Sequence, residues 1–357
     1  MESIEQTFNG TADFGKKVTV TVSRNGDLIT KCYVQSTLPA VDGSGSNVAW
    51  VEEVGHFLIK SVEVEIGGQR IDKHYGTWLS VWSSLTTTKG HEAGYNSMIG
   101  NVSTLTALDA DTTPAYDLYV PLQFWFCRHT GLALPLIALQ YHEVKFSIEF
   151  ETFANLQQNS DAVGSYSLGD TSMFIDYIYL DTDERRRFAQ ISHEYLIEQL
   201  QFTGDESLSG TNNKIKLNFN HPVKELVWVV QNDNRTGNNF TDDNTKSAGS
   251  NPTSVAKLQL NGHDRFSQRK GRYFNEVQPY QCHENIPATG INVYSFALKP
   301  EEQQPSGSAN MSRIDNATLQ LTLTSAAAVS NPIVKVFATN YNVLRIMSGM
   351  GGLAYSN

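Results

Sequence analysis

The chain has 357 residues, of which 40% are hydrophobic and 18% charged, so it is long enough and apolar enough to build two domain cores. Its formal net charge is −10 and its longest basic run is Arg185 to Arg187, which excludes the broad cationic face that nucleic-acid binding requires. Cys32, Cys127 and Cys282 form no C-x-x-C motif, so we expect free, buried thiols and a reducing compartment.

Alternation of apolar and polar residues predicts strands along the whole chain. The pattern is clearest in KVTVTVS, SVEVEIG, KIKLNFN and TLQLTLT, where every second residue is apolar. Four dipeptides accept the positive φ of tight hairpin turns: Asn25-Gly26, Gly67-Gly68, Asn212-Asn213 and Asn261-Gly262. These features indicate an all-β protein.

Two long polar segments, Thr86–Ala115 and Gln231–Thr253, show neither a strand nor a helix pattern. Loops of this length are usually functional or mobile. We expect both to be loops that decorate one end of a β-sandwich.

The region from Asp117 to Glu151 contains two strand patterns joined by an apolar connection with a proline. Val144–Glu151 alternates strictly, as a half-buried strand does. The connection carries leucine and isoleucine side chains that need a partner surface, namely Leu132, Leu134, Leu136 and Ile137. We therefore predict that these four residues lie in the core of the domain or at a contact with another subunit.

A charge run at Asp183–Glu194 interrupts the strands. Thr182–Ile191 is the best helix candidate, with Thr182 or Asp183 as its cap. We place the domain boundary here, with one β unit at 1–183, a linker with a short helix at 184–194 and a second β unit at 195–357.

A weak internal repeat indicates that the two units are duplicates. SVEVEIGGQRIDKHYGTW at Ser61–Trp78 aligns with VAKLQLNGHDRFSQRKGRY at Val255–Tyr273, and VKFSIEF at Val144–Phe150 aligns with ATLQLTL at Ala317–Leu323. The two alignments have different offsets, so the units would differ in loop length.

Four long blocks, taken in order, resemble one family over nearly the whole chain. They are His56–Thr86 (HFLIKSVEVEIGGQRIDKHYGTWLSVWSSLT), Asp117–Glu151, Leu180–Gln201 (LDTDERRRFAQISHEYLIEQLQ) and Asn340–Asn357 (NYNVLRIMSGMGGLAYSN). The resemblance is to the major capsid proteins of large icosahedral double-stranded DNA viruses of the phycodnavirus, iridovirus and mimivirus-like group.

This resemblance implies two consecutive eight-stranded antiparallel jelly rolls in one chain. It also implies a homotrimer of nearly hexagonal outline that tiles an icosahedral shell around an internal membrane. The expected partners are neighbouring capsomers and the minor capsid and penton proteins, with no direct nucleic-acid contact. The expected location is the virion, assembled in the host cytoplasm. Because members of the family usually carry additional residues ahead of the segment that matches MESIEQTF, we expect Met1 to be either an internal methionine of a longer product or the start of a trimmed chain.

Short motifs for catalysis and cofactor binding fail when their context is considered. GTADFGKK at Gly10–Lys17 nearly matches a phosphate-binding loop, but Lys17 replaces the hydroxyl residue and a strand follows instead of a helix. GMGGLA at Gly349–Ala354 nearly matches a dinucleotide-binding turn, but too few residues remain for its helix, so we expect a flexible tail. The His-Glu pairs lack the spacing of zinc proteases. We therefore expect no enzyme, no cofactor and no metal.

Two kinds of surface chemistry stay open. The sequons at Asn101, Asn234 and Asn239 lie in the long polar segments and are our candidates for glycosylation. The five tryptophans could stack on sugars in a carbohydrate-binding β-sandwich of the viral fibre or lectin type, which is the alternative function. Core packing is favoured for Trp125 and Trp228, which lie in predicted strands, and an interface for Trp78 and Trp82.

Overall fold

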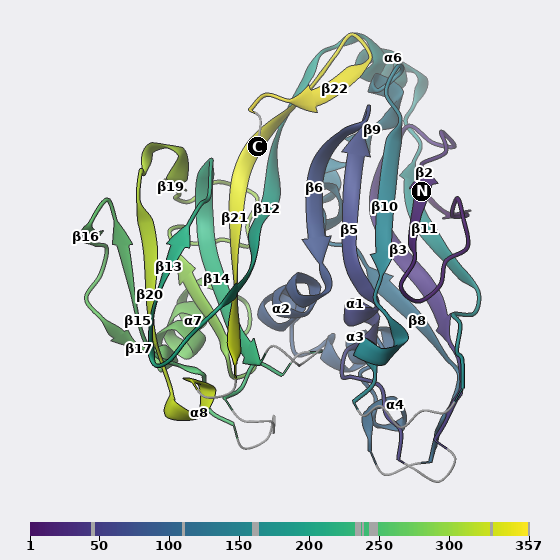
Figure 1. The fold of residues 1–357 in the computed structure, drawn as a ribbon. Coiled ribbons are helices and arrows are strands. Elements are labelled where there is room, and N and C mark those ends of the chain that lie inside the picture. The colour runs from purple at the N-terminus through teal and green to yellow at the C-terminus, as the bar shows by residue number, and fades with distance from the viewer. Residues whose placement is uncertain are drawn as a thin grey trace.

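The computed structural model describes residues 1–43, 47–108, 111–158, 164–232, 237, 239–242, 249–328 and 331–355. These residues form two antiparallel β-sandwiches side by side (Figure 1). The four main sheets follow one another across the view, from β16 at the left edge to β1 and the N-terminus at the right.

The first sandwich consists of two facing sheets, each with four principal strands. One sheet has the order β1 (Glu2–Gln6), β11 (Thr171–Ile178), β3 (Leu28–Leu38), β8 (Tyr116–Pro121). The other has the order β2 (Lys17–Thr21), β10 (Val144–Phe150), β5 (Ile59–Ile66), β6 (Gln69–Tyr75). The short strand β9 (Leu134–Pro135) pairs with β3, and β4 (Val41–Asp42) pairs with β7 (Thr112–Thr113).

The second sandwich repeats this arrangement. Its first sheet has the order β12 (His193–Ser207), β21 (Pro332–Met347), β14 (Pro222–Asn232), β18 (Ile291–Ser295). Its second sheet has the order β13 (Asn212–Leu217), β20 (Ala317–Leu323), β15 (Thr253–Leu260), β16 (His263–Asp264). The short strands are β17 (Arg269–Lys270) on β15, β19 (Ala309–Asn310) on β14 and β22 (Met350–Leu353) on β21.

The order of strands identifies each sandwich as a jelly roll. When the eight principal strands of a sandwich are counted along the chain, one sheet holds the first, eighth, third and sixth, and the other the second, seventh, fourth and fifth. Both sandwiches obey this rule, so the protein is a double jelly roll. The predicted repeat is confirmed, because β5 and β15 occupy the same place, as do β10 and β20.

Short helices join the strands. The α-helices are α1 (Val54–Leu58), α2 (Gly76–Thr86), α3 (Glu92–Met98), α4 (Ser103–Thr106), α5 (Trp125–Arg128), α6 (Thr182–Gln190), α7 (Gln278–Cys282) and α8 (Ser325–Ala328). The 3-10 turns are η1 (Thr130–Leu132), η2 (Leu136–Ala138), η3 (Phe153–Leu156) and η5 (Met311–Arg313), and η4 (Tyr273–Val277) is a π-helical turn. No helix in the described parts of the chain is both long and apolar enough to cross a membrane.

Several local predictions need correction. Thr86–Ala115 is not a plain loop, since it forms α3, α4 and β7 around the buried side chains of Ile99 and Leu105. Within Gln231–Thr253, residues 233–236, 238 and 243–248 lie outside the described residues. Trp125 begins a helix and not a strand, although it is buried as expected.

The predicted linker helix is confirmed as α6, but its cap is different. The N-cap is Asp181, whose backbone N–H donates to Oε2 of Glu184 at 3.2 Å in a capping box. The sequence offered several adjacent acidic and hydroxyl residues, and only the backbone path decides which one precedes the first helical turn.

Two of the four predicted hairpin turns are confirmed. Gly67-Gly68 joins β5 to β6 and Asn261-Gly262 joins β15 to β16, with positive φ at all four residues. Asn25-Gly26 instead connects β2 and β3, which belong to different sheets, and Asn212-Asn213 lies inside β13. A turn dipeptide permits a reversal but does not choose the strand that pairs.

The C-terminal strands β21 and β22 of the second jelly roll also pack against the first jelly roll. The first core, filled by residues such as Val20, Phe146 and Ile148, includes Leu344 and Ile346 of β21. GMGGLA is not a flexible tail, because β22 pairs with β21 and Gly351 lies so close to Leu139 that a Cβ atom would meet Cδ2 of Leu139 at 2.7 Å.

Candidate assembly surfaces

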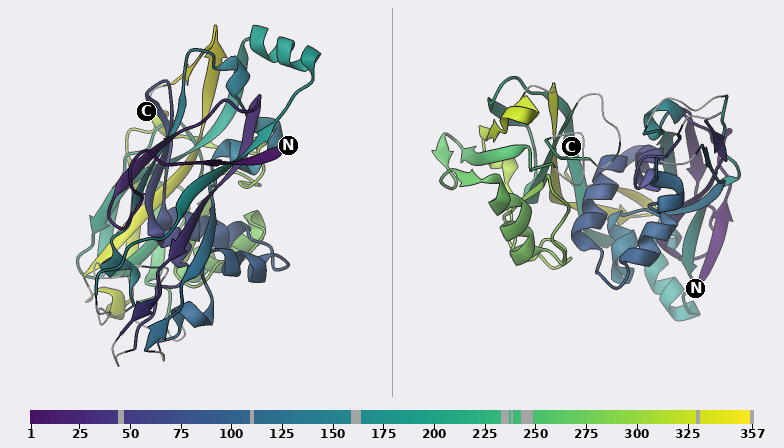
Figure 2. Two further views of the ribbon diagram at one scale, coloured as in Figure 1. Left: turned by 90° about the vertical axis from the view of Figure 1, so that its right-hand side faces the viewer. Right: turned by 90° about the horizontal axis from the view of Figure 1, so that it is seen from below.

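Helix α2 fills the space between the two jelly rolls (Figure 2, right). It starts at Gly76, where any Cβ would lie 2.6 Å from the carbonyl oxygen of His56. Its tryptophans pack on the outer face of the β12-β21-β14-β18 sheet, with the rings of Trp78 and Phe337 5.4 Å apart. Trp78 and Trp82, predicted at an interface, therefore lie at one within the chain. The cluster comprises Trp78, Val81, Trp82, Leu85, Val227, Val229, Phe240, Ile291, Val293 and Phe337.

Hydrogen bonds fix the edges of this junction. The backbone N–H of Leu200 donates to Oδ1 of Asp72 at 3.0 Å, and the side chain of Gln199 donates to the carbonyl of Ile71. At the other end, Asn285 donates from its backbone to the carbonyl of Leu85 at 3.0 Å and from its side chain to that of Ser84 at 3.1 Å. Two carbonyls in the last turn of α2 thus accept hydrogen bonds from the second jelly roll.

A buried charge network crosses the junction. Nη1 of Arg128 lies 2.9 Å from Oε2 of Glu198, and its guanidinium lies 4.0 Å from the ring centroid of Trp82. Glu198 also accepts from Nζ of Lys224, which is 1% exposed. Burial lowers the pKa of Lys224, and the charge of Glu198 opposes this shift. Removing one member would leave an unpaired charge in an apolar setting.

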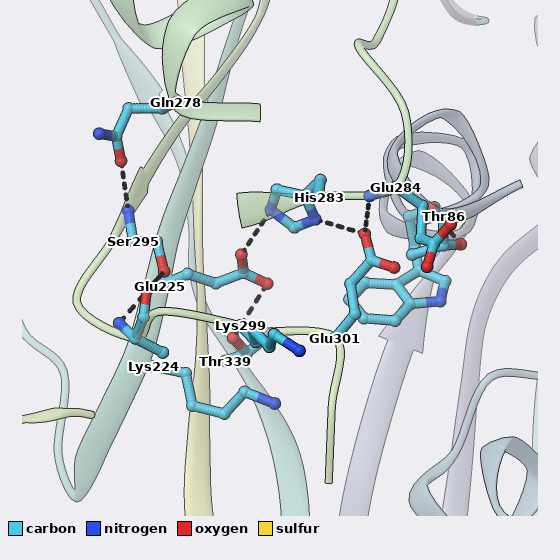
Figure 3. Close-up of polar contacts among 12 residues, drawn as sticks. Thr86, Lys224, Glu225, Gln278, His283, Glu284, Ser295, Lys299, Glu301 and Thr339 are labelled. Atoms are coloured by element: carbon cyan, nitrogen blue, oxygen red, sulfur yellow. Dashed lines mark hydrogen bonds and ion pairs between the residues drawn. The ribbon is translucent and has the colours of Figure 1, made fainter. Parts of the chain in front are cut away.

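A second buried cluster, the His283 cluster, holds the segment that precedes Asn285 (Figure 3). Nε2 of His283 lies 3.0 Å from Oε2 of Glu225, and Nδ1 lies 2.7 Å from Oε1 of Glu301. Burial alone would lower the pKa of His283, but the two carboxylates outweigh burial and raise it to about 9.

The pKa of Glu225 is lowered, in contrast to that of His283. Burial favours its neutral form, yet His283 and Lys224 hold the pKa of its carboxyl below the usual range, and Oγ1 of Thr339 donates to Oε1 at 3.3 Å. Both ring nitrogens of His283 face carboxylates and its side chain is fully buried, so the cluster is suited to locking the loop and not to proton transfer with a substrate.

Sequence reasoning missed both polar networks. His283-Glu284 is one of the His-Glu pairs whose spacing does not match that of zinc proteases. The available signal was the pair Lys224-Glu225 inside the apolar run VKELVWVV of β14, because adjacent charges in a strand buried on both faces need partners.

The outer face of the β1-β11-β3-β8 sheet, called the aromatic face below, carries Tyr33, Phe174 and Tyr119. The rings of Tyr33 and Phe174 stack with centroids 5.2 Å apart, and the ring of Tyr119 lies 6.2 Å from that of Tyr33. Tyr119 is 36% exposed, and Met98 of α3 beside it is 39% exposed. A hollow of about 510 Å³ is lined by Tyr33, Met98 and Tyr119 among others.

The four apolar residues predicted at a core or subunit contact are placed on the first jelly roll. Leu134 and Leu136 are buried in its core, while Leu132 and Ile137 are half-buried. Arg24 donates to the carbonyl of Leu136 at 3.2 Å and ties the connection to the strands around it. A role for the four residues in subunit contact stays a prediction.

The candidate glycosylation residues do not come together. Asn101 precedes α4, and its side chain donates to Oδ1 of Asn96 at 3.3 Å. Asn239 accepts from the hydroxyl of Thr241 at 2.7 Å and precedes Phe240, which is buried at the junction. Asn234 lies outside the described residues. Glycosylation stays a prediction at all three positions.

Other chemistry is sparse. Among the described residues, no group of three or more His, Cys, Asp or Glu side chains is placed to hold a metal ion. The thiols of Cys32 and Cys127 are buried, and that of Cys282 is half-buried. The prominent features of the molecule are thus its packing surfaces.

Comparison with known proteins places the chain in a family. The family described as "Major capsid protein N-terminus" matches residues 1–181, and that described as "Large eukaryotic DNA virus major capsid protein" matches residues 184–352. The major capsid protein of Pyramimonas orientalis virus is 56% identical, with all of this chain and 90% of the relative covered. The chain belongs to the major capsid proteins of large eukaryotic DNA viruses.

Other capsid proteins agree with this assignment. The major capsid protein of Paramecium bursaria Chlorella virus 1 is 43% identical, with all of this chain and 91% of the relative covered. The structure titled "PBCV-1 virus capsid, quasi-atomic model" matches with a TM-score of 0.88 at 40% identity, covering 100% of this chain and 96% of the other. The Faustovirus major capsid protein shares the fold, with a TM-score of 0.82 at 13% identity over 97% of this chain and 90% of the other. The chain is accordingly a structural capsid protein of the virion.

Proposed function

We propose that three copies of this capsid protein form a trimer of nearly hexagonal outline that tiles an icosahedral shell. One observation carries the proposal: each chain holds two jelly rolls of the same strand order side by side. Three chains then supply six similar sandwiches, so threefold symmetry imitates the hexagon needed to cover a surface. The likeness to the chain in the PBCV-1 virus capsid supports this arrangement.

The proposed partners follow from the same arrangement. They are two further copies of the chain within the trimer, neighbouring trimers, and the minor capsid and penton proteins that join them. An internal viral membrane would lie beneath the shell, the genome would not touch this surface, and assembly would take place in the host cytoplasm. We also propose the division into 1–183, a linker at 184–194, and 195–357, supported by the position of α6 between β11 and β12.

We propose no catalytic role, because the buried titratable clusters described above are closed by their own partners. The carbohydrate-binding alternative is weakened by the five tryptophans, which are 0–4% exposed and offer no ring face for a sugar.

The test is the mass of the purified protein in solution, measured by light scattering behind size exclusion. A trimer of 39.7 kDa chains has a mass of about 119 kDa, and images of it should show a hexagonal outline. A stable monomer that binds glycans on an array would contradict the proposal and favour the carbohydrate-binding alternative.

A further inference from the structure

Each of the two surfaces that meet between the jelly rolls has an equivalent element elsewhere in the chain. In the first jelly roll, α2 follows β6 and packs on the neighbouring sheet. In the second, β16 occupies the place of β6, and η4 and α7 follow β16 and the short strand β17 along the chain. Phe274 and Gln278 of this segment point inward, whereas Val277 is 40% and Tyr280 77% exposed. Because Val277 and Tyr280 are three residues apart, they form one apolar side of the helical segment.

The sheet that receives α2 also has a counterpart. On the outer face of the second jelly roll, the strand register places four side chains in one row, namely Phe202, Phe337, Val227 and Val293. On the aromatic face of the first jelly roll, the corresponding strands place another four in one row, namely Glu5, Phe174, Tyr33 and Pro121. The first row is covered by α2, and no described segment of the chain covers the second.

We propose that the η4–α7 segment of one copy packs on the aromatic face of the next copy and so repeats between chains the contact that α2 makes within a chain. This inference rests on the proposed trimer and names its subunit interface. The two surfaces lie on different jelly rolls, so the contact is head-to-tail, with each copy giving one surface and receiving the other. Three copies close the ring when the step within a chain and the step between chains add up to a third of a full turn, which two equal steps of a sixth of a turn satisfy.

The charges of the two surfaces are complementary. The outward charged residues of the aromatic face are Glu5, Asp117 and Asp176, against one lysine, Lys31. The η4–α7 side presents Arg269, Lys270 and Arg272 against Glu276. An acidic face with aromatic residues at its centre thus meets a basic rim around Val277 and Tyr280, which favours association and fixes its orientation.

A mixed cross-linking experiment tests the pairing. One chain carries Tyr280→Cys and the other Tyr119→Cys, both with Cys127→Ser and Cys282→Ser, so that the remaining native thiol is Cys32, which is 2% exposed. The two chains are co-expressed and oxidised. A covalent dimer of about 79 kDa, twice the chain mass, is expected from the mixture and not from either chain alone. A control mixture replaces Tyr280→Cys by Tyr141→Cys, because Tyr141 is 76% exposed but lies outside both surfaces.

A second measurement does not depend on cysteine. Tyr280→Ser should weaken the trimer by about tenfold or more in its dissociation midpoint, as expected for an aromatic residue at the centre of an interface. Tyr141→Ser removes an equally exposed tyrosine and should leave the midpoint unchanged. Normal melting of the separated subunits would show that Tyr280→Ser still folds.

The outcomes separate the two proposals. If the wild-type protein is monomeric, the proposed trimer and this interface both fail. If it is trimeric but Tyr280→Ser behaves like Tyr141→Ser and the mixture gives no more dimer than the control, the interface is wrong while the trimer stands.

Discussion

The outer faces of the two equivalent sheets are built from different residues. The face of the second jelly roll, which α2 covers, is apolar across its row, with Val227, Val293 and Phe337. The aromatic face of the first carries Tyr33, Phe174 and several charges, and stays half-exposed. A face that becomes buried during folding can consist of apolar side chains alone. A face that is exposed to solvent before assembly needs amphipathic side chains for solubility. The same strand order therefore supports one permanent contact and one that forms later.

The largest expected effect compares a charge on the two faces directly. Phe337→Asp places an unpaired carboxylate against Trp78 and should destabilise the subunit by about 4 kcal/mol or more. Phe174→Asp, on the half-exposed face, should cost about 1 kcal/mol. Urea unfolding of the separated subunits measures both values. Equal losses would mean that the two faces are equally buried within one chain.

The contribution of α2 can be measured by truncation. Trp78→Ala should destabilise the subunit by about 3–5 kcal/mol, because Trp78 is fully buried between the jelly rolls and a cavity remains. Tyr141→Ala, at an exposed position, should change the stability by about 0.5 kcal/mol or less. If thermal melting shows the same small shift for both, the junction is not a stabilising core.

The His283 cluster predicts that the protein becomes less stable as the pH rises above 6.5. The pKa of His283 is raised from 6.5 to about 9 in the folded state, so its contribution is fully present below pH 6.5 and is lost as the pH rises to about 9. The unfolding free energy should fall by about 3 kcal/mol across this interval. The lowered pKa of Glu225 keeps its own contribution in place until the pH falls below 4.5.

Denaturant titrations between pH 6 and 9.5 measure this slope. His283→Gln should remove most of it and should also lower the stability at pH 6, since Glu225 loses its buried partner. His91→Gln, at an exposed histidine, should keep the wild-type slope. A slope that survives His283→Gln would assign the pH dependence to other groups.

The smallest effect concerns α6, which connects the two halves. Nε of Arg185 lies 2.9 Å from Oδ1 of Asp27, whose side chain is 7% exposed, while Arg186 approaches Asp183 only at 4.0 Å with both side chains exposed. Arg185→Ala should cost about 0.5–1 kcal/mol and Arg186→Ala close to zero. Indistinguishable melting curves would show that α6 is not held by this ion pair.

Much of the fold follows from short-range patterns. The alternation of Phe146, Ile148 and Phe150 correctly predicts β10, and the paired glycines at 67 and 68 correctly predict the turn between β5 and β6. The aligned segments around these strands were sufficient to detect the duplication. The strand period and positive φ depend on a few adjacent residues, so both can be predicted from the sequence without knowledge of the fold.

The sequence by itself determined the all-β class, the duplicated units and the family of this protein, because period, turn chemistry and long ordered motifs are properties of neighbouring residues. Only the tertiary structure decided which outer face α2 covers, that Trp78 and Trp82 form an internal junction, and that Glu225, His283 and Glu301 meet. These contacts join residues from separate strands and loops. Their existence depends on how the two jelly rolls pack, and no local pattern along the chain encodes that packing.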